Sequence, residues 1–103
     1  SVWDTQAPAV EVTTKEIVIR QTYGYDVKAL AQRITEYSDN ETPKEDLIFG
    51  VTVSYNAAAV SANGDGTYDL TSEGTYIVTV RVTDLFGRTG SATFSIVVRG
   101  NEI

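Results

Sequence analysis

Carboxylates are the main side chains of this chain that could do chemistry. The 103 residues include 14 Asp and Glu but no His and no Cys. This composition excludes thiolate nucleophiles, disulfides, zinc sites built from Cys and His, and every triad that needs an imidazole base. A pair of carboxylates acting as in a glycosidase is the one catalytic arrangement left. The acidic residues occur in turn-like segments that would leave them solvated, whereas catalysis requires the perturbed pKa that burial provides. We therefore predict that the chain is not an enzyme.

Metal binding is the second kind of chemistry that these oxygen-bearing side chains could support. Acidic and amide residues recur where turns are expected, at Asp4, Asp39, Asn40, Glu41, Asp65 and Asp84. Ca2+ takes about six to eight oxygen ligands, so a fold that gathers these turns at one end would offer it a site. The alternative is a solvated acidic end, because no spacing here matches an EF-hand.

Aromatic side chains are candidates for sugar binding, since their faces can stack on sugar rings. The residues concerned are Trp3, Tyr23, Tyr25, Tyr37 and Tyr55. Tyrosines also fill the cores and edges of β-proteins with their hydroxyls in water. A carbohydrate-binding module should present these rings together on one face, whereas a structural module should show them isolated.

The overall composition and charge limit the classes of partner that the chain is expected to bind. The net charge of −6 and the pI near 4.4 predict repulsion from nucleic acid and from anionic lipid. No apolar run is long enough to cross a membrane, so we predict no membrane insertion. At 103 residues the chain is expected to form one domain.

Residues 74–98, GTYIVTVRVTDLFGRTGSATFSIVV, contain the most regular pattern of the chain. Apolar and polar residues alternate on both sides of a break at residues 84–90. Successive side chains of a strand point to opposite faces, so each half predicts a strand with one buried face. Two such runs joined by a short loop with glycine predict an antiparallel hairpin.

Shorter runs predict further strands at residues 8–12, 16–20, 47–55, 57–62 and 67–70. Residues 26–37 differ, because their apolar residues recur at the spacing of one helix face: Val27, Leu30, Ala31 and Ile34. We predict a short helix over 27–36, capped by the carboxylate of Asp26, with extended structure as the alternative.

About seven short strands separated by turns predict an all-β fold, an antiparallel β-sandwich. Tyr76, two residues before an inward-facing valine, occupies the place of the tyrosine corner in such folds. Its hydroxyl should bond to the main chain a few residues upstream, which is a structural role. The expected core is Val10, Val12, Ile17, Ile19, Leu30, Ile34, Phe49, Val51, Val53, Tyr68, Leu70, Tyr76, Val78, Val80, Val82, Phe94, Ile96 and Val98.

The pattern Gly-Thr-Tyr-x-Val-Thr-Val-x-Val-Thr-Asp-x-x-Gly-x-x-Gly-x-Ala-Thr-Phe-x-Ile-x-Val at 74–98 resembles the closing strands of bacterial immunoglobulin-like domains. Hyalin-repeat and polycystin-type modules of cell-surface proteins are similar. The opening Asp4-Thr5-Gln6-Ala7-Pro8 resembles the junction at which such modules start, and Ser38-Asp39-Asn40 resembles their acidic loop. The helix-like stretch at 27–36 departs from the family pattern.

This resemblance implies an immunoglobulin-like sandwich over residues 1–103, with linkers at 1–7 and 100–103. It also implies a non-catalytic spacer or adhesion module of a larger bacterial surface or secreted protein, located outside the cell. Neighbouring domains of the same chain are the expected partners, together with a host protein or polysaccharide, and the module should be a monomer. The inference depends on analogy of fold rather than on a site.

The order of strands in such a sandwich would place several loops at one pole. These are the chain start, loop 39–45, turn 63–66 and loop 84–90, with the two termini at opposite poles. This arrangement would gather the calcium candidates named above. The alternative function is therefore a carbohydrate- or protein-binding module in which Ca2+ stiffens one pole.

Overall fold

The computed structural model describes residues 6–101, and the chain in this range is mostly β. Its nine strands, one α-helix and one 3-10 helix follow in the order β1 (Ala9–Val12), β2 (Glu16–Arg20), β3 (Thr22–Tyr25), α1 (Val27–Ile34), β4 (Thr35–Ser38), η1 (Lys44–Asp46), β5 (Ile48–Tyr55), β6 (Ala58–Val60), β7 (Tyr68–Leu70), β8 (Gly74–Thr83) and β9 (Thr89–Arg99).

The predicted hairpin forms the centre of a five-stranded sheet with the strand order β2-β9-β8-β5-β6. β8 and β9 pair antiparallel, with Val78 opposite Phe94 and Thr79 opposite Thr93. Along β8 the side chains alternate between buried and exposed, as the period-two pattern predicts. The hairpin prediction is confirmed.

The sheet is mixed, so the prediction of an all-antiparallel arrangement was wrong. β2 pairs with β9 in parallel, with Ile17 opposite Ile96. The two strands lie at opposite ends of the chain, and a parallel pair needs a long crossover between them. Alternation within each run identified most of the strands but carried no information on which of them would become neighbours.

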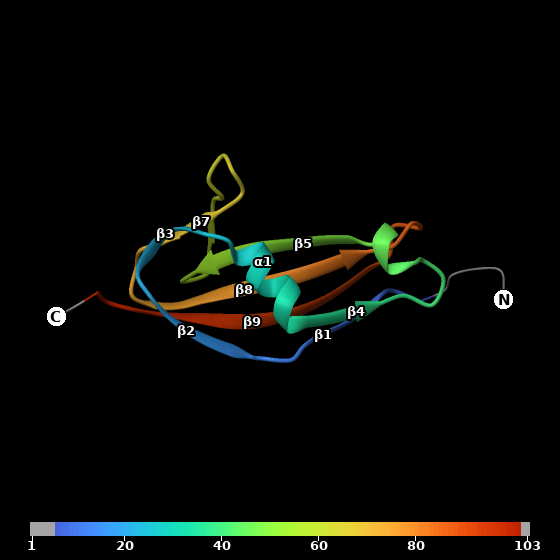
Figure 1. Cartoon of the computed structure of the whole chain (residues 1–103), viewed down its shortest axis with the longest axis horizontal. Coiled ribbons are helices and arrows are strands. Elements are labelled where there is room, and N and C mark those ends of the chain that lie inside the picture. Colours follow the sequence, from blue (N-terminus) through green and yellow to red (C-terminus); the bar gives the residue numbers. More distant parts are fainter. Residues whose placement is uncertain (1–5, 102–103) are drawn as a thin grey trace.

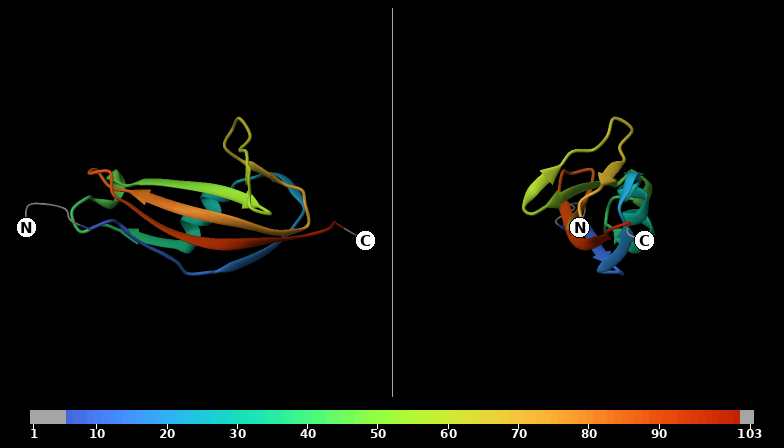
Figure 2. Two further views of the ribbon diagram at one scale, coloured as in Figure 1. Left: turned by 180° about the vertical axis from the view of Figure 1, so that it is seen from behind. Right: turned by 90° about the vertical axis from the view of Figure 1, so that its left-hand side faces the viewer.

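A second layer lies against one face of this sheet and is made of small pieces (Figure 1 and Figure 2). It consists of two two-stranded sheets, β1-β4 and β3-β7, with α1 between β3 and β4 in the chain. The predicted helix is confirmed at Val27–Ile34, and the carboxylate of Asp26 accepts a hydrogen bond from the amide of Ala29 at 3.0 Å. The alternative, extended structure, holds for Thr35–Ser38. The strands on either side of the helix, β3 and β4, were not among the predicted strands, and they raise the number of strands above seven.

The core lies between the two layers. The inward residues of the hairpin are buried, and so are Leu70 and Phe94. Five residues of the expected core are only partly buried: Val10, Ile17, Ile19, Ile34 and Val51. Three residues of the buried hydrophobic core were not in it, namely Val27, Ala31 and Leu47. Val27 and Ala31 lie on the inner face of α1, so the helix contributes more of its apolar face to the core than the expected core contained.

The molecule is elongated, with extents of 59 × 27 × 23 Å. The described chain enters at one end of the long axis and leaves at the other (Figure 1). Loops 39–45 and 84–88 lie at the entry end, whereas the loop that contains residues 63–66 lies beside β3 and β7 toward the exit end. The expectation that turn 63–66 shares the pole of the other acidic loops was therefore wrong. No helix in the range 6–101 has the length and apolar character needed to span a membrane.

Candidate functional site

Two loops that carry calcium candidates meet at the entry end of the molecule. The amide of Leu85 donates a hydrogen bond to the hydroxyl of Thr42 at 3.3 Å, which joins loop 84–88 to loop 39–42. Asp84 is only 3 % exposed, and its Oδ1 accepts hydrogen bonds from the amides of Phe86 and Arg88, both at 2.9 Å. One oxygen of Asp84 therefore holds its own turn, while Oδ2 is buried and accepts no hydrogen bond.

The remaining calcium candidates are only partly brought together. Oδ2 of Asp39 accepts hydrogen bonds from the amides of Glu41 and Thr42 at 3.2 and 3.0 Å. Asn40 and Glu41 are exposed on the same loop, and Asp4 lies outside the described residues. Within residues 6–101 no group of three or more acidic side chains is placed to hold a metal ion. The calcium site stays a prediction, and Asp39 and Asp84 each have a turn-forming role beside it.

Asp65 belongs to a separate cluster near β3. The amide and the hydroxyl of Thr67 both donate to Oδ1 of Asp65. Oδ1 of Asp69 accepts hydrogen bonds from the side chain of Asn63 and from the amide of Gly24, both at 2.9 Å. Hydrogen bonds favour the ionised form, so those from Thr67 hold the pKa of Asp65 below its ordinary value of 3.8, and those from Asn63 and Gly24 do the same for the pKa of Asp69.

Replacing Asn63 with alanine should raise the pKa of Asp69 toward its ordinary value, because the largest cause of the lowering is removed. A carboxyl whose pKa is lowered by folding adds stability above its unfolded-state pKa and loses it as the pH falls through the folded-state pKa. The variant should therefore show a weaker loss of stability on acidification below the ordinary value of 3.8. An NMR titration of the Asp69 carboxyl carbon measures this, and an unchanged titration would show that the Asn63 contact is irrelevant.

The aromatic residues do not form one platform for sugar within the described chain. Tyr23 is 78 % exposed on β3 at one end of the molecule. Tyr37 packs on Phe49, with ring centroids 5.1 Å apart, and Tyr55 packs on Tyr76 at 4.7 Å. The rings are thus spread over several elements and engaged in local packing, and Trp3 lies outside the described residues.

Tyr76 is buried at 3 % exposure, and its hydroxyl accepts a hydrogen bond from the amide of Ser72 at 3.0 Å. The bond runs back four residues to the main chain and closes the turn that leads into β8. A tyrosine corner has this geometry.

Replacing Tyr76 with phenylalanine should lower the free energy of unfolding by about 1 kcal/mol, because the ring stays while the amide of Ser72 loses its acceptor. Tyr23→Phe is the matched control, since this hydroxyl belongs to a largely exposed side chain. Urea denaturation of the two variants compares them. Equal stability would argue that the hydroxyl of Tyr76 has no structural role.

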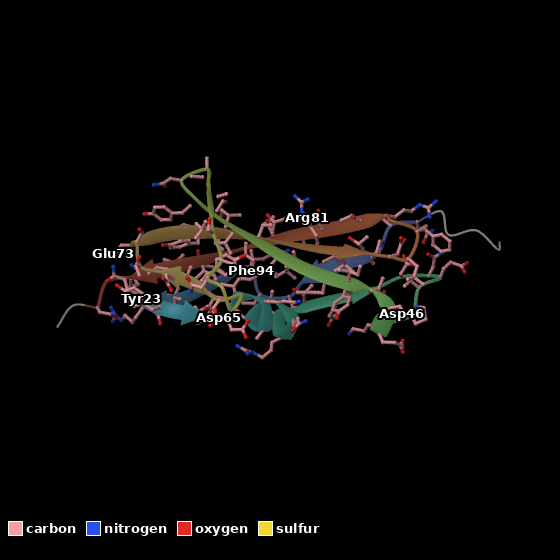
Figure 3. The ribbon with its side chains drawn as sticks, turned by 90° about the horizontal axis from the view of Figure 1, so that it is seen from above. Tyr23, Asp46, Asp65, Glu73, Arg81 and Phe94 are labelled. Carbon is pink, nitrogen blue, oxygen red and sulfur yellow. The ribbon has the colours of Figure 1, made fainter. Side chains whose placement is uncertain are left out.

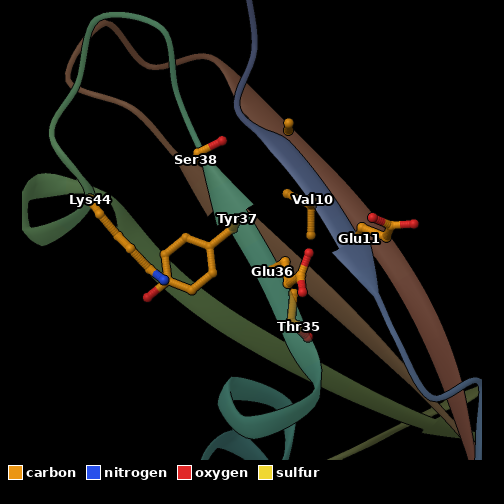
Figure 4. Close-up of a pocket in the computed structure, with 8 residues that line it drawn as sticks. Val10, Glu11, Thr35, Glu36, Tyr37, Ser38 and Lys44 are labelled. Atoms are coloured by element: carbon orange, nitrogen blue, oxygen red, sulfur yellow. The ribbon is translucent and has the colours of Figure 1, made fainter.

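A shallow groove of about 440 Å³ lies over the small sheet β1-β4 (Figure 4). Glu11 of β1 and Glu36 of β4 are direct cross-strand partners, and both line it. Lys44 lines the groove from η1, with its Nζ 4.6 Å from the centre of the Tyr37 ring. Sequence reasoning missed Glu11, Glu36 and Lys44, because nothing in the pattern indicated that β1 pairs with β4 or in which register.

Comparison with models of known protein families gives no match for this chain, and comparison with curated proteins gives none either. The resemblance to bacterial immunoglobulin-like domains therefore remains a prediction.

Proposed function

We propose that this chain is an immunoglobulin-like, non-catalytic spacer or adhesion module of a larger bacterial surface or secreted protein. The observation that carries the proposal is the elongated shape of the molecule, with the two ends of the described chain far apart. The described chain enters and leaves at opposite ends of a body whose longest dimension is 59 Å. The central strands β8 and β9 run along that axis (Figure 1). A module built in this way separates whatever is joined to its two ends.

The arrangement of layers supports the immunoglobulin-like assignment. A hairpin at the centre of one sheet, a first strand in the other layer, and the Tyr76 bond to Ser72 are features of such sandwiches. The insertion of α1 between β3 and β4 is the main departure. The surface setting is supported by the resemblance of residues 74–98 to the closing strands of such modules, which is an argument by analogy.

A spacer must keep its length, and paired spin labels measure this. The chain has no cysteine, so Tyr23→Cys with Asp46→Cys provides two unique labelling positions. Both residues are exposed, and they lie toward opposite ends of the long axis (Figure 3). We expect a single narrow distance distribution by double electron–electron resonance. A broad distribution, or one centred far below the length of the body, would contradict a spacer role.

Copies joined in tandem provide a second test. Small-angle X-ray scattering of one, two and three copies should show a maximum dimension that grows by a similar increment with each copy. A compact particle whose maximum dimension hardly grows would show that neighbouring copies fold back on one another, and it would remove the mechanical argument.

A binding function is the second candidate, and the groove over β1-β4 favours a protein ligand over a sugar. Its lining contains carboxylates and one lysine, and its single ring, that of Tyr37, already contacts Lys44 and Phe49. A stacked sugar needs an open aromatic face, whereas carboxylates beside strands suit a peptide.

A further inference from the structure

One edge of the small sheet β1-β4 is unpaired. β4 pairs with β1, and within residues 6–101 no strand pairs with its other edge. The amide of Thr13 donates to the carbonyl of Ile34 at 2.7 Å, which fixes the alternation of the ladder. By this alternation Glu36 bonds toward β1, while the N–H and C=O of Tyr37 point to the open edge.

The helix is the reason that this edge is open. α1 separates β3 from β4, and β7 pairs with β3 on the far side of the helix. β7 is only three residues long, from Tyr68 to Leu70, so it does not extend alongside β4. The edge that would be covered in a continuous sheet is therefore left with its main-chain groups unpaired, and such an edge is a template for another strand.

The groove next to this edge carries negative charge that the protein does not neutralise. Glu11 and Glu36 are directly opposite, both are exposed, and neither has an ion pair in the described part of the chain. Like charges at directly opposite positions of a sheet are unfavourable. Lys44 lines the same groove, but its ammonium group lies over the ring of Tyr37.

Thr35 of β4 is a polar residue next to this edge whose hydroxyl group is unsatisfied. It lines the groove at 6 % exposure, and its hydroxyl oxygen is buried with no hydrogen-bond partner. Buried polar groups are usually bonded, and leaving one unpaired costs free energy. An open strand edge and two carboxylates without counter-charges thus occur together on one small sheet, and the unpaired hydroxyl of Thr35 lies on the buried face of the same strand.

We propose that the open edge of β4 accepts an extended, Lys- or Arg-bearing segment of a protein partner as an added strand. The main chain of the segment pairs with the N–H and C=O of Tyr37, and its cationic side chain lies opposite Glu36 on the outward face. Glu11 lies one strand further away and contributes less. A divalent cation fits less well, because two carboxylates supply few of the oxygens that Ca2+ requires. This inference goes beyond a spacer role and does not depend on it.

The test uses an acetylated and amidated peptide of alternating Thr and Lys, titrated into the ¹⁵N-labelled protein and followed by NMR. We expect saturable shifts at the amides of 35–38 and slower hydrogen exchange at Tyr37. Glu36→Gln should weaken binding about two- to fivefold and Glu11→Gln less, in line with the strength of cross-strand charge pairs. Lys44→Gln should strengthen binding, because it removes a positive charge beside the site. Salt should weaken binding by screening.

Three controls separate strand addition from general attraction to an acidic protein. Glu16→Gln, an exposed carboxylate on β2, should leave the affinity unchanged. The same peptide methylated at alternate backbone nitrogens keeps its charge but cannot pair, and it should not bind. Ca2+ alone should not reproduce the shifts at 35–38. The proposal is overturned if the methylated peptide binds equally well, if Ca2+ gives the same shifts, or if millimolar peptide leaves residues 35–38 unmoved.

Discussion

Replacing Gly90 with alanine should destabilise the fold by about 3 kcal/mol or more, at the upper end of the cost of overpacking. Gly90 lies near the start of β9, opposite Val82. A Cβ atom added there would fall on the carbonyl oxygen of Pro8 and approach the side chain of Val10. The obstacle is main chain, which cannot rotate aside, so β1 would have to move off β9.

Gly50→Ala is the matched control for this prediction. Gly50 also lies in the five-stranded sheet, on β5 opposite Arg81, but a Cβ added there would meet no atom within 4 Å. Alanine should be neutral or stabilising by up to about 1 kcal/mol, because glycine weakens a strand. Urea denaturation compares the two variants, and equal stabilities would mean that β1 does not approach β9 as closely as described.

Replacing Phe94 with alanine should lower the free energy of unfolding by about 3–5 kcal/mol, the usual cost of deleting a buried ring. Phe94 is 2 % exposed and lies opposite Val78 in the centre of the sheet (Figure 3). The neighbouring strands are fixed by their own pairing and can close the cavity only in part.

Thr93→Ala controls for the strand itself, since Thr93 is the adjacent residue and its side chain is exposed. We expect a change within about 0.5 kcal/mol, as for most surface substitutions. Thermal melts of both variants give the comparison. A Phe94→Ala loss as small as that of Thr93→Ala would show that the interior between the two layers is not packed around this ring.

Phe94 and Gly90 test two different structural requirements of the proposed spacer. Phe94 holds the hairpin, which forms the long axis of the module. Gly90 allows the first strand to close over the hairpin where the chain enters. Either substitution should destabilise the folded module. Glu36→Gln should instead weaken peptide binding at the open edge of β4 while the stability changes little, because this carboxylate is exposed.

Local patterns determined much of the secondary structure. The alternation along residues 74–98 predicted the hairpin and most of its buried face, because a strand side chain can only point to one of two faces. The spacing of Val27, Leu30 and Ala31 predicted the helix, and the short polar side chain of Asp26 predicted where it begins. These inferences rest on geometry within a few residues, so no knowledge of the rest of the chain was needed.

Pairing between distant segments was decided by the tertiary structure alone. The parallel contact of β2 with β9 and the register that sets Glu11 against Glu36 depend on how the two layers pack. Turn 63–66 was placed at the wrong end for the same reason, since its position follows from the pairing of β7 with β3. Many pairings satisfy the same alternation, and only the packing of the two layers selects one of them. The open edge of β4 is a product of that selection, so no local pattern could have revealed it.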